Sequence, residues 1–401
     1  MIVADGSETV TTSKARPWPY AAAVCAAIIA FLYLVVWARR YGLDLKVYRD
    51  SVRAWESGYN PYHRTFTSHR LPFAYPPFAL AVLSPLGWLS FLISQWLVWV
   101  ASIAAATGSV LLVLRDRGIR LTGRTWCYAF AWSCISIIVF EPARSGVDYG
   151  QIEFILMFMV VTDILAAPSR YRGILVGIAA AVKLTPLVFI LVFAVGRDVR
   201  SVVRSTASFV VCSGLSWFFW PRLSRIFWFQ DLSNPSRLGS VIYGGNQSWY
   251  AILHRPPFPD AGSEVAWLLL SIVTAAASGF VAWRCLNANE RAFAVVAVGL
   301  AGLMISPISW THHWVLVLLI PVMIAGRRSS VVSRPVRVLL WGLIALTVIA
   351  PYWWFSSGTP ADIFGAILPI WTGLLLVVWA VIEFRAWRAD ATAGQCGLHG
   401  G

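Results

Sequence analysis

The sequence predicts an all-α membrane protein that crosses the bilayer about 12 times. Two observations lead to this fold class. Of the 401 residues, 58% are hydrophobic and only 12% are charged, a balance that lies outside the range of soluble globular domains. The apolar residues form runs of roughly 13 to 24 residues between basic or Pro- and Gly-rich breaks. These runs favour helices, because the strands of a membrane barrel would alternate polar and apolar residues.

The first long apolar run, residues 20–38, indicates a retained membrane span and not a cleaved signal peptide. The residues before it lack a basic region, and no small-residue cleavage site follows it. Several later runs are shorter than the roughly 20 residues of a straight span, so partial or tilted helices are expected among them. The later predicted spans lie near residues 77–114, 125–140, 152–167, 173–182, 186–196, 205–220, 264–283, 292–305, 314–326, 338–351 and 364–383.

Residues 20–383 are predicted to form a single transmembrane domain between two cytoplasmic tails, residues 1–19 and 384–401. This orientation follows the positive-inside rule, because short basic connectors such as residues 115–120 fall on the cytoplasmic side and the longer loops on the other. The net charge of +14 is spread over short clusters, which indicates topology and not a nucleic-acid surface. The connectors contain no phosphate-binding loop, which argues against a nucleotide-driven pump. The predicted outer loops are residues 39–76, 141–151, 221–263, 306–313 and 352–363.

Charge first becomes dense in residues 42–50, directly after the first span. An ionisable residue beside a membrane span is a functional candidate, and the carboxylate of Asp44 is a candidate base for a sugar hydroxyl. Residues 47–56 have the amphipathic pattern of a helix that lies in the membrane interface. Asp44 is therefore also a candidate N-terminal cap of that helix, and the two roles are compatible.

Residues 141–153 join two predicted spans and place three acidic residues, Arg144 and Gln151 in an outer turn. Two glycines in this turn permit a close approach of the backbone to a ligand. The alternative is an ordinary hydrophilic turn that binds nothing.

Lys183 lies inside an apolar stretch, in the motif Lys183-Leu-Thr-Pro186. A lysine in such a stretch is costly unless it pairs or reaches the interface, and the proline breaks the helix beside it. We therefore expect two half-helices that meet near the outer face, with an ammonium group suited to an anionic lipid phosphate. The alternative is a lysine that only extends its side chain to the membrane surface.

Two further motifs lie in the later outer loops. Asn246 and Gln247 stand between aromatic segments, a combination that suits carbohydrate because aromatic faces stack on sugar rings while amides bind hydroxyls. His312 and His313 are adjacent to one another. We expect no metal there, because two adjacent histidines on a helix cannot both face one ion and no further cluster completes a site. Hydrogen bonds to a phosphate or a carboxylate are their expected role.

These motifs occur together in the order of a known family. The chain resembles the polyprenol-phosphate-mannose-dependent mannosyltransferases of actinobacteria, which are GT87-like membrane glycosyltransferases of the GT-C type, over about residues 20 to 383. Within that family it is similar to the α-1,2-mannosyltransferases that build phosphatidylinositol mannosides and lipomannan. Ile152 and Glu153 depart from the Val-Asn pair expected at that point. The shared motifs are Asp44-Leu-x-Val-Tyr48, Tyr75-Pro-Pro-Phe78, Gly150-Gln-Ile, Lys183-Leu-Thr-Pro186, Gly245-Asn-Gln-Ser248 and Ser306-Pro-Ile-Ser-Trp-x-His-His313.

The resemblance implies a monomeric enzyme that takes mannose from polyprenyl-phosphate-mannose on the outer face of the plasma membrane. It implies inversion at the anomeric carbon with one base and no covalent intermediate, cofactor or metal. The implied acceptor is a phosphatidylinositol mannoside or lipomannan. The implied site residues are Asp44 as general base with His312 as a second catalytic residue, Lys183, Arg144 and His313 at the donor phosphate, and Tyr48, Gln151, Asn246 and Gln247 at the sugars.

Three other roles remain compatible with the sequence. A transporter or flippase of lipid-linked sugars would share the helices and the outer aromatic residues, but the two halves of the chain show no internal repeat. A non-catalytic assembly subunit is disfavoured because the polar motifs gather on one predicted face. A transferase of another lipid-linked sugar, such as arabinofuranose, is the remaining alternative.

Overall fold

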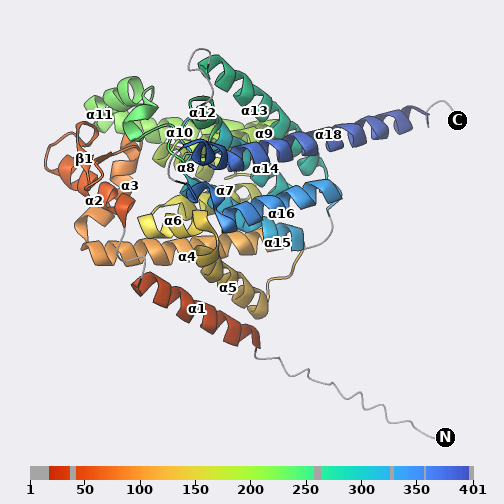
Figure 1. Ribbon diagram of the computed structural model, residues 1–401, viewed down its shortest axis with the longest axis horizontal. Helices are drawn as coiled ribbons and strands as arrows, with labels where there is room; N and C mark the ends of the chain where they lie inside the picture. The colour runs from red at the N-terminus through yellow and green to blue at the C-terminus, as the bar shows by residue number, and fades with distance from the viewer. Residues whose placement is uncertain (1–17, 37–41, 257–262, 326–328, 356–357, 397–401) are drawn as a thin grey trace, which may run out of the picture.

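The computed structural model describes residues 18–36, 42–256, 263–325, 329–355 and 358–396, and this part of the chain is mostly helical (Figure 1). Residues 1–17 of the predicted N-terminal tail lie outside the described residues. Small pieces of the predicted outer loops also lie outside them, residues 39–41, 257–262 and 356–357. The predicted C-terminal tail forms, as far as residue 396, the end of a long helix that projects from the body of the molecule in Figure 1.

Six helical segments among the described residues are long and apolar enough to cross a membrane, as expected for a multi-pass membrane protein. A seventh span results if α5 (Gly123–Val139) and α6 (Glu141–Tyr149), which meet at 85°, cross together. The expected count of about 12 spans is not confirmed, because other apolar helices have only 10–17 residues. The six segments are α1 (Trp18–Val36), α4 (Phe91–Asp116), α10 (Val199–Phe219), α13 (Ser263–Asn287), α16 (Arg334–Ile349) with η7 (Pro351–Trp353), and α17 (Gly358–Gly365) with α18 (Ile367–Cys396).

Shorter apolar helices coincide closely with the other predicted spans. The predicted helix break beside Lys183 is confirmed, since α8 ends at Val182, Lys183 is extended, and Pro186 lies in the first turn of the next helix. The shorter helices are α3 (Pro77–Trp88), α7 (Glu153–Leu165), α8 (Ile174–Val182), η3 (Thr185–Phe189), α9 (Ile190–Val195), α14 (Arg291–Ile305), η6 (Thr311–Leu319) and α15 (Ile320–Ala325).

Helix α14 forms the centre of the core. Its residues 292–301 are buried all round, as is usual for an apolar helix that other helices enclose. It packs against α13, η3 and η6. Two ion pairs fasten its first residues to the end of α4, one between Arg117 and Glu290 and one between Asp116 and Arg291.

Short elements gather at one end of the molecule, where Figure 1 shows α2, β1, α3 and α11. The expected amphipathic helix is α2 (Leu43–Glu56), which buries Val47, Ser51 and Ala54. Arg49 is buried as well, because its guanidinium donates to the carbonyls of Leu86 and Leu89 around the end of α3, at 3.0 and 2.7 Å. The other elements are η2 (Pro61–His63), β1 (Thr65–Phe66) paired antiparallel with β2 (Leu71–Pro72), α11 (Pro221–Ile226), η4 (Phe227–Asp231), η5 (Pro235–Leu238) and α12 (Trp249–Leu253).

The outer turn expected at residues 141–151 is instead mostly helix α6. Pro142 in its first turn favours helical backbone, and Gly150 ends the helix in the left-handed conformation with φ 73°. A Cβ at position 150 would lie 2.7 Å from Cβ of Leu45. Glycine therefore lets the link between α6 and α7 pack directly against α2, which brings Gln151 beside Asp44.

Candidate functional site

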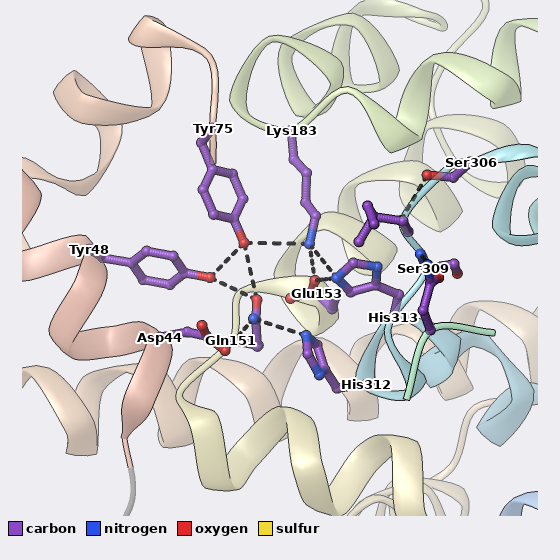
Figure 2. A network of polar contacts seen from close by, with 12 residues as sticks. Asp44, Tyr48, Tyr75, Gln151, Glu153, Lys183, Ser306, Ser309, His312 and His313 are labelled. Carbon is purple, nitrogen blue, oxygen red and sulfur yellow. Dashed lines mark hydrogen bonds and ion pairs between the residues drawn. The ribbon is translucent and has the colours of Figure 1, made fainter. Parts of the chain in front are cut away.

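Polar side chains from separate segments converge in one group, which we call the polar cluster (Figure 2). Helix α2, the link before α3, the start of α7, the break between α8 and η3, and the first turn of η6 each contribute to it. Hydrogen bonds and an ion pair join its members into one network. The polar cluster consists of Asp44, Tyr48, Tyr75, Gln151, Glu153, Lys183, His312 and His313.

Asp44 lies in the first turn of α2 and is partly buried. The N-cap is Gly42, and no side chain caps the helix, so the alternative role of Asp44 as a helix cap is wrong. Its Oδ2 instead accepts a hydrogen bond of 2.6 Å from Nε2 of Gln151. Burial raises the pKa of Asp44 to about 7, and the hydrogen bond from Gln151 opposes that rise. A carboxyl group with this pKa can both take up and release a proton near neutral pH.

The Gln151 side chain faces other members of the cluster on both sides. Its Nε2 also lies 3.1 Å from Nε2 of His312. Because an amide nitrogen only donates, Nε2 of His312 must accept, which places the ring proton on Nδ1. Oε1 of Gln151 accepts from the hydroxyls of Tyr48 at 2.7 Å and Tyr75 at 3.1 Å. Gln151 thus orients Asp44 and His312, while the sugar contacts expected for Gln151 and Tyr48 stay predictions.

Lys183 extends from the helix break into the polar cluster. Its ammonium pairs with the Glu153 carboxylate and donates to Nε2 of His313 at 3.2 Å and to the hydroxyl of Tyr75 at 3.4 Å. The alternative, in which the lysine only reaches the membrane surface, is therefore wrong. Its position beside polar groups and at a break in the backbone suits the binding of an anionic head group.

The two adjacent histidines converge with Glu153, contrary to expectation. Their ring planes are almost perpendicular, at 86°, and ligand atoms of all three residues lie within 4.8 Å of one another. The expectation that no further residue completes a site was wrong, because the third member, Glu153, comes from α7, which packs against η6. The absence of a bound metal stays a prediction. Two imidazoles and a carboxylate could hold a zinc-like ion. The Lys183 ammonium already pairs with Glu153, however, so the protein itself supplies a positive charge there.

Three predicted site residues have other surroundings. Arg144 lies on α6 and donates to the carbonyl of Ile138 at 3.4 Å. Asn246 is fully buried, and its amide donates to backbone carbonyls while Oδ1 accepts from the Ser309 amide at 2.8 Å. Gln247 is also fully buried and donates to the carbonyls of two glycines, both at 2.6 Å. The Asn246 amide fastens its loop to the segment before η6, and the Gln247 amide fastens the loop to the end of α17. The sugar and phosphate contacts predicted for the three residues stay predictions.

Sequence reasoning missed Glu141 as a positioning residue. This carboxylate is buried at the start of α6, where it accepts hydrogen bonds from Thr311 at 3.0 Å, Tyr352 at 2.7 Å and Trp353 at 3.0 Å. Thr311 immediately precedes His312, so Glu141 fixes the first turn of η6. The local signal for such a residue is a lone glutamate that begins a helix directly after an apolar run. The sequence does not show its hydrogen-bond partners, because they lie far away in the chain.

Comparisons with known proteins identify relatives of the chain. The model of glycosyltransferase family 87 matches residues 73–307. Over 377 residues the chain is 33% identical to a polyprenol-phosphate-mannose-dependent α-(1-2)-phosphatidylinositol pentamannoside mannosyltransferase of Mycolicibacterium smegmatis, a match that covers 92% of this chain and 89% of that protein. No solved structure matches the chain.

Two more relatives have similar names. A pentamannoside mannosyltransferase of the same description from Mycobacterium tuberculosis is 34% identical over 323 residues, which cover 80% of this chain and 73% of the relative. A polyprenol-phosphate-mannose-dependent α-(1-2)-phosphatidylinositol mannoside mannosyltransferase of Mycolicibacterium smegmatis is 30% identical over 372 residues, 84% of this chain and 77% of the relative. The match to the family model contains four of the eight members of the polar cluster, Tyr75, Gln151, Glu153 and Lys183.

Proposed function

Because the chain belongs to glycosyltransferase family 87, we propose that it transfers mannose from polyprenyl-phosphate-mannose to a mannosylated lipid with inversion at the anomeric carbon. The acceptor is a phosphatidylinositol mannoside or lipomannan, and the new bond is an α-1,2 linkage. The names of the relatives, which specify this donor and linkage and a phosphatidylinositol mannoside, support the proposal. The polar cluster is complete within one chain, which supports a monomer, and the positive-inside pattern supports reaction on the outer face of the plasma membrane.

One observation carries the chemical part of this proposal. The polar cluster contains a carboxylate with a pKa near neutrality, Asp44, and an ammonium group, Lys183, joined through Gln151 and Tyr75. An inverting transfer needs one base for the incoming hydroxyl and positive charge for the departing phosphate. It needs no second carboxylate as a nucleophile, and Glu153, the other carboxylate of the cluster, is paired with Lys183.

The proposed reaction is a single displacement. The acceptor hydroxyl oxygen attacks the anomeric carbon of mannose as Asp44 takes the hydroxyl proton, and the bond from that carbon to the phosphate oxygen breaks. Polyprenyl phosphate leaves with the bonding electrons. A β-linked donor then yields an α-mannoside.

Lys183 and His313 are the proposed contacts for the donor phosphate. Charge grows on the phosphate as its bond to the sugar breaks, so a cation fixed there stabilises the transition state more than the ground state. Before the donor binds, Glu153 balances the charge of Lys183. His312, which accepts a hydrogen bond from Gln151, is proposed to help hold the base in place. Arg144, Tyr48, Asn246 and Gln247 remain predicted contacts.

A donor and acceptor assay tests this function. The full chain is purified in lipid nanodiscs and given a mannosylated phosphatidylinositol with either polyprenyl-phosphate-mannose or polyprenyl-phosphate-arabinofuranose. We expect an acceptor longer by one hexose, with the new linkage identified as α-1,2 by nuclear magnetic resonance. Transfer of a pentose instead would show that the sugar is wrong. If the protein is instead placed in liposomes and moves the donor across their bilayer without transferring its sugar, a transporter is favoured.

A further inference from the structure

A cavity of about 80 Å³ adjoins the Lys183 end of the polar cluster. Glu153 and His313 line it, and both of them contact Lys183. The rest of its wall is almost entirely apolar and comes from α7, η3, α14 and η6. Thr185, which also lines the cavity, is exposed at the helix break, so the cavity reaches the surface of the molecule there. Its shape suits an amphiphile whose anionic group rests at the ammonium.

Two glycines of α14, Gly299 and Gly302, line the cavity one helical turn apart. A Cβ at position 299 would lie 2.4 Å from Cδ2 of Leu316 and 3.1 Å from Cζ of Phe189. A Cβ at position 302 would lie 2.7 Å from Cγ1 of Val188. All three neighbours line the same cavity, and a methyl group at either glycine must displace them. The glycines therefore let these three side chains pack closely against α14, and alanine at either position would shift the wall of the cavity.

We propose that this cavity receives the isoprene unit next to the phosphate of the donor, and that Gly299 and Gly302 determine the fit of that unit. The inference rests on the proposed function and adds a residue-level basis for recognition of the lipid carrier. A dry cavity of roughly 150 Å³ holds a benzene molecule, so this cavity, at about half that volume, takes the branched end of one five-carbon unit and not a whole chain. The rest of the polyprenol then runs into the bilayer past the exposed break at Thr185.

The proposal distinguishes the carrier from an unbranched lipid. An isoprene unit carries a branching methyl and a planar double bond directly after the phosphate ester, whereas an alkyl chain has neither. Burial of the methyl alone is worth about fourfold in binding. This contact lies away from the reacting bond and is made equally in the ground state and the transition state. It therefore changes KM and leaves kcat unchanged.

The test compares two mannosyl phosphates that differ only in the tail, one of two cis isoprene units and one a linear alkyl chain of equal length. For the wild-type chain in nanodiscs we expect a KM at least about fourfold lower with the isoprenoid donor. Gly299→Ala and Gly302→Ala are expected to remove that preference, so that the KM values for the two donors become equal. Gly279→Ala is the matched control on α13, because its Cβ would meet nothing closer than 3.6 Å and should keep the preference.

The outcomes separate this inference from the proposed function. If neither donor yields mannosylated acceptor, the proposed function fails. If mannose is transferred but the wild type has no tail preference, or the glycine variants keep it, the cavity is not the isoprene subsite. A prenyl phosphate with a photoreactive group on its first unit gives an independent result without any variant. Labelling of peptides from α7, η3, α14 or η6 supports the subsite, and labelling confined to helices that do not line the cavity overturns it.

Discussion

Nε2 of Gln151 donates a hydrogen bond of 2.6 Å to Oδ2 of Asp44, across 107 positions of the chain. The contact depends on Gly150, whose lack of a side chain lets the α6–α7 link pack against Leu45 of α2. The same amide accepts from two tyrosines, one of which also contacts Lys183. The proposed base and the proposed phosphate contact therefore belong to one hydrogen-bonded unit.

The wild-type enzyme should lose activity as the pH falls through about 7, because burial raises the pKa of Asp44 to about that value and the base must be ionised. The direction of this pH dependence follows from the charge of a carboxyl group, which is mostly protonated, and so neutral, at a pH below its pKa. Log kcat/KM should rise with unit slope up to that pH and then level. An activity that does not change between pH 5.5 and 8.5 would contradict the role of Asp44.

Replacement of Gln151 by methionine keeps the length of the side chain and removes its hydrogen bond to Asp44. Hydrogen bonds to charged groups contribute about 1.5–3 kcal/mol, so the pKa of Asp44 should rise by about one or more. The acidic limb of the kcat/KM profile should move to higher pH by the same amount. The control is Gln230→Met, since Gln230 is exposed on η4. An unmoved profile in Gln151→Met would show that the amide does not tune the base.

Lys183 variants test whether the positive charge at the departing phosphate comes from the Lys183 ammonium or from a bound metal ion. Because the ammonium already pairs with Glu153, we expect chelators to leave wild-type activity unchanged. Lys183→Ala should lower kcat by about 10² to 10³, as is typical when one stabilising group is removed from a transition state. The variant should also bind zinc at Glu153, His312 and His313, measurable by calorimetry. Loss of wild-type activity in chelator, restored by a divalent ion, would contradict this assignment.

Glu141→Gln should weaken both the fold and the catalytic site. An amide nitrogen would replace one oxygen that faces donors from Thr311, Tyr352 and Trp353, and a broken buried contact of this kind costs about 1–3 kcal/mol. We expect a lower melting temperature and a lower kcat. Ser145→Ala removes one further donor to the same carboxylate, at 2.5 Å, and should have a smaller effect on both. Equal melting temperatures for wild type and Glu141→Gln would show that the carboxylate does not hold η6 in place.

Local chemistry made part of this structure predictable. Pro186 beside a lysine in an apolar stretch correctly predicted the break between α8 and η3, because proline lacks the backbone N–H of a helix interior and is tolerated in the first turn of the helix that follows. The amphipathic pattern after Asp44 correctly predicted α2. The order of the motifs correctly identified the family. The number of membrane spans could not be predicted in the same way, because hydropathy does not distinguish a short buried helix from a helix that crosses the membrane.

Contacts between distant segments were less predictable. Asn246 and Gln247 are polar and near aromatic residues, so they resemble sugar ligands, but their amides are used by backbone carbonyls that only the folded chain brings near. Glu153 was counted as one acid of a turn, although it begins α7 opposite Lys183. The convergence of His312 and His313 with Glu153 likewise needs the packing of η6 against α7.

The most direct test compares Asp44→Asn with Asp50→Asn, two substitutions of the same kind on α2. Both proteins are purified in nanodiscs, checked for folding by thermal unfolding, and assayed with polyprenyl-phosphate-mannose and a mannosylated phosphatidylinositol. We expect Asp44→Asn to keep its melting temperature and lose about 10² to 10⁴ in kcat, the usual contribution of a general base, while Asp50→Asn stays active. Full activity of Asp44→Asn would contradict the assignment of the base, and loss of activity in Asp50→Asn alone would move that role to Asp50.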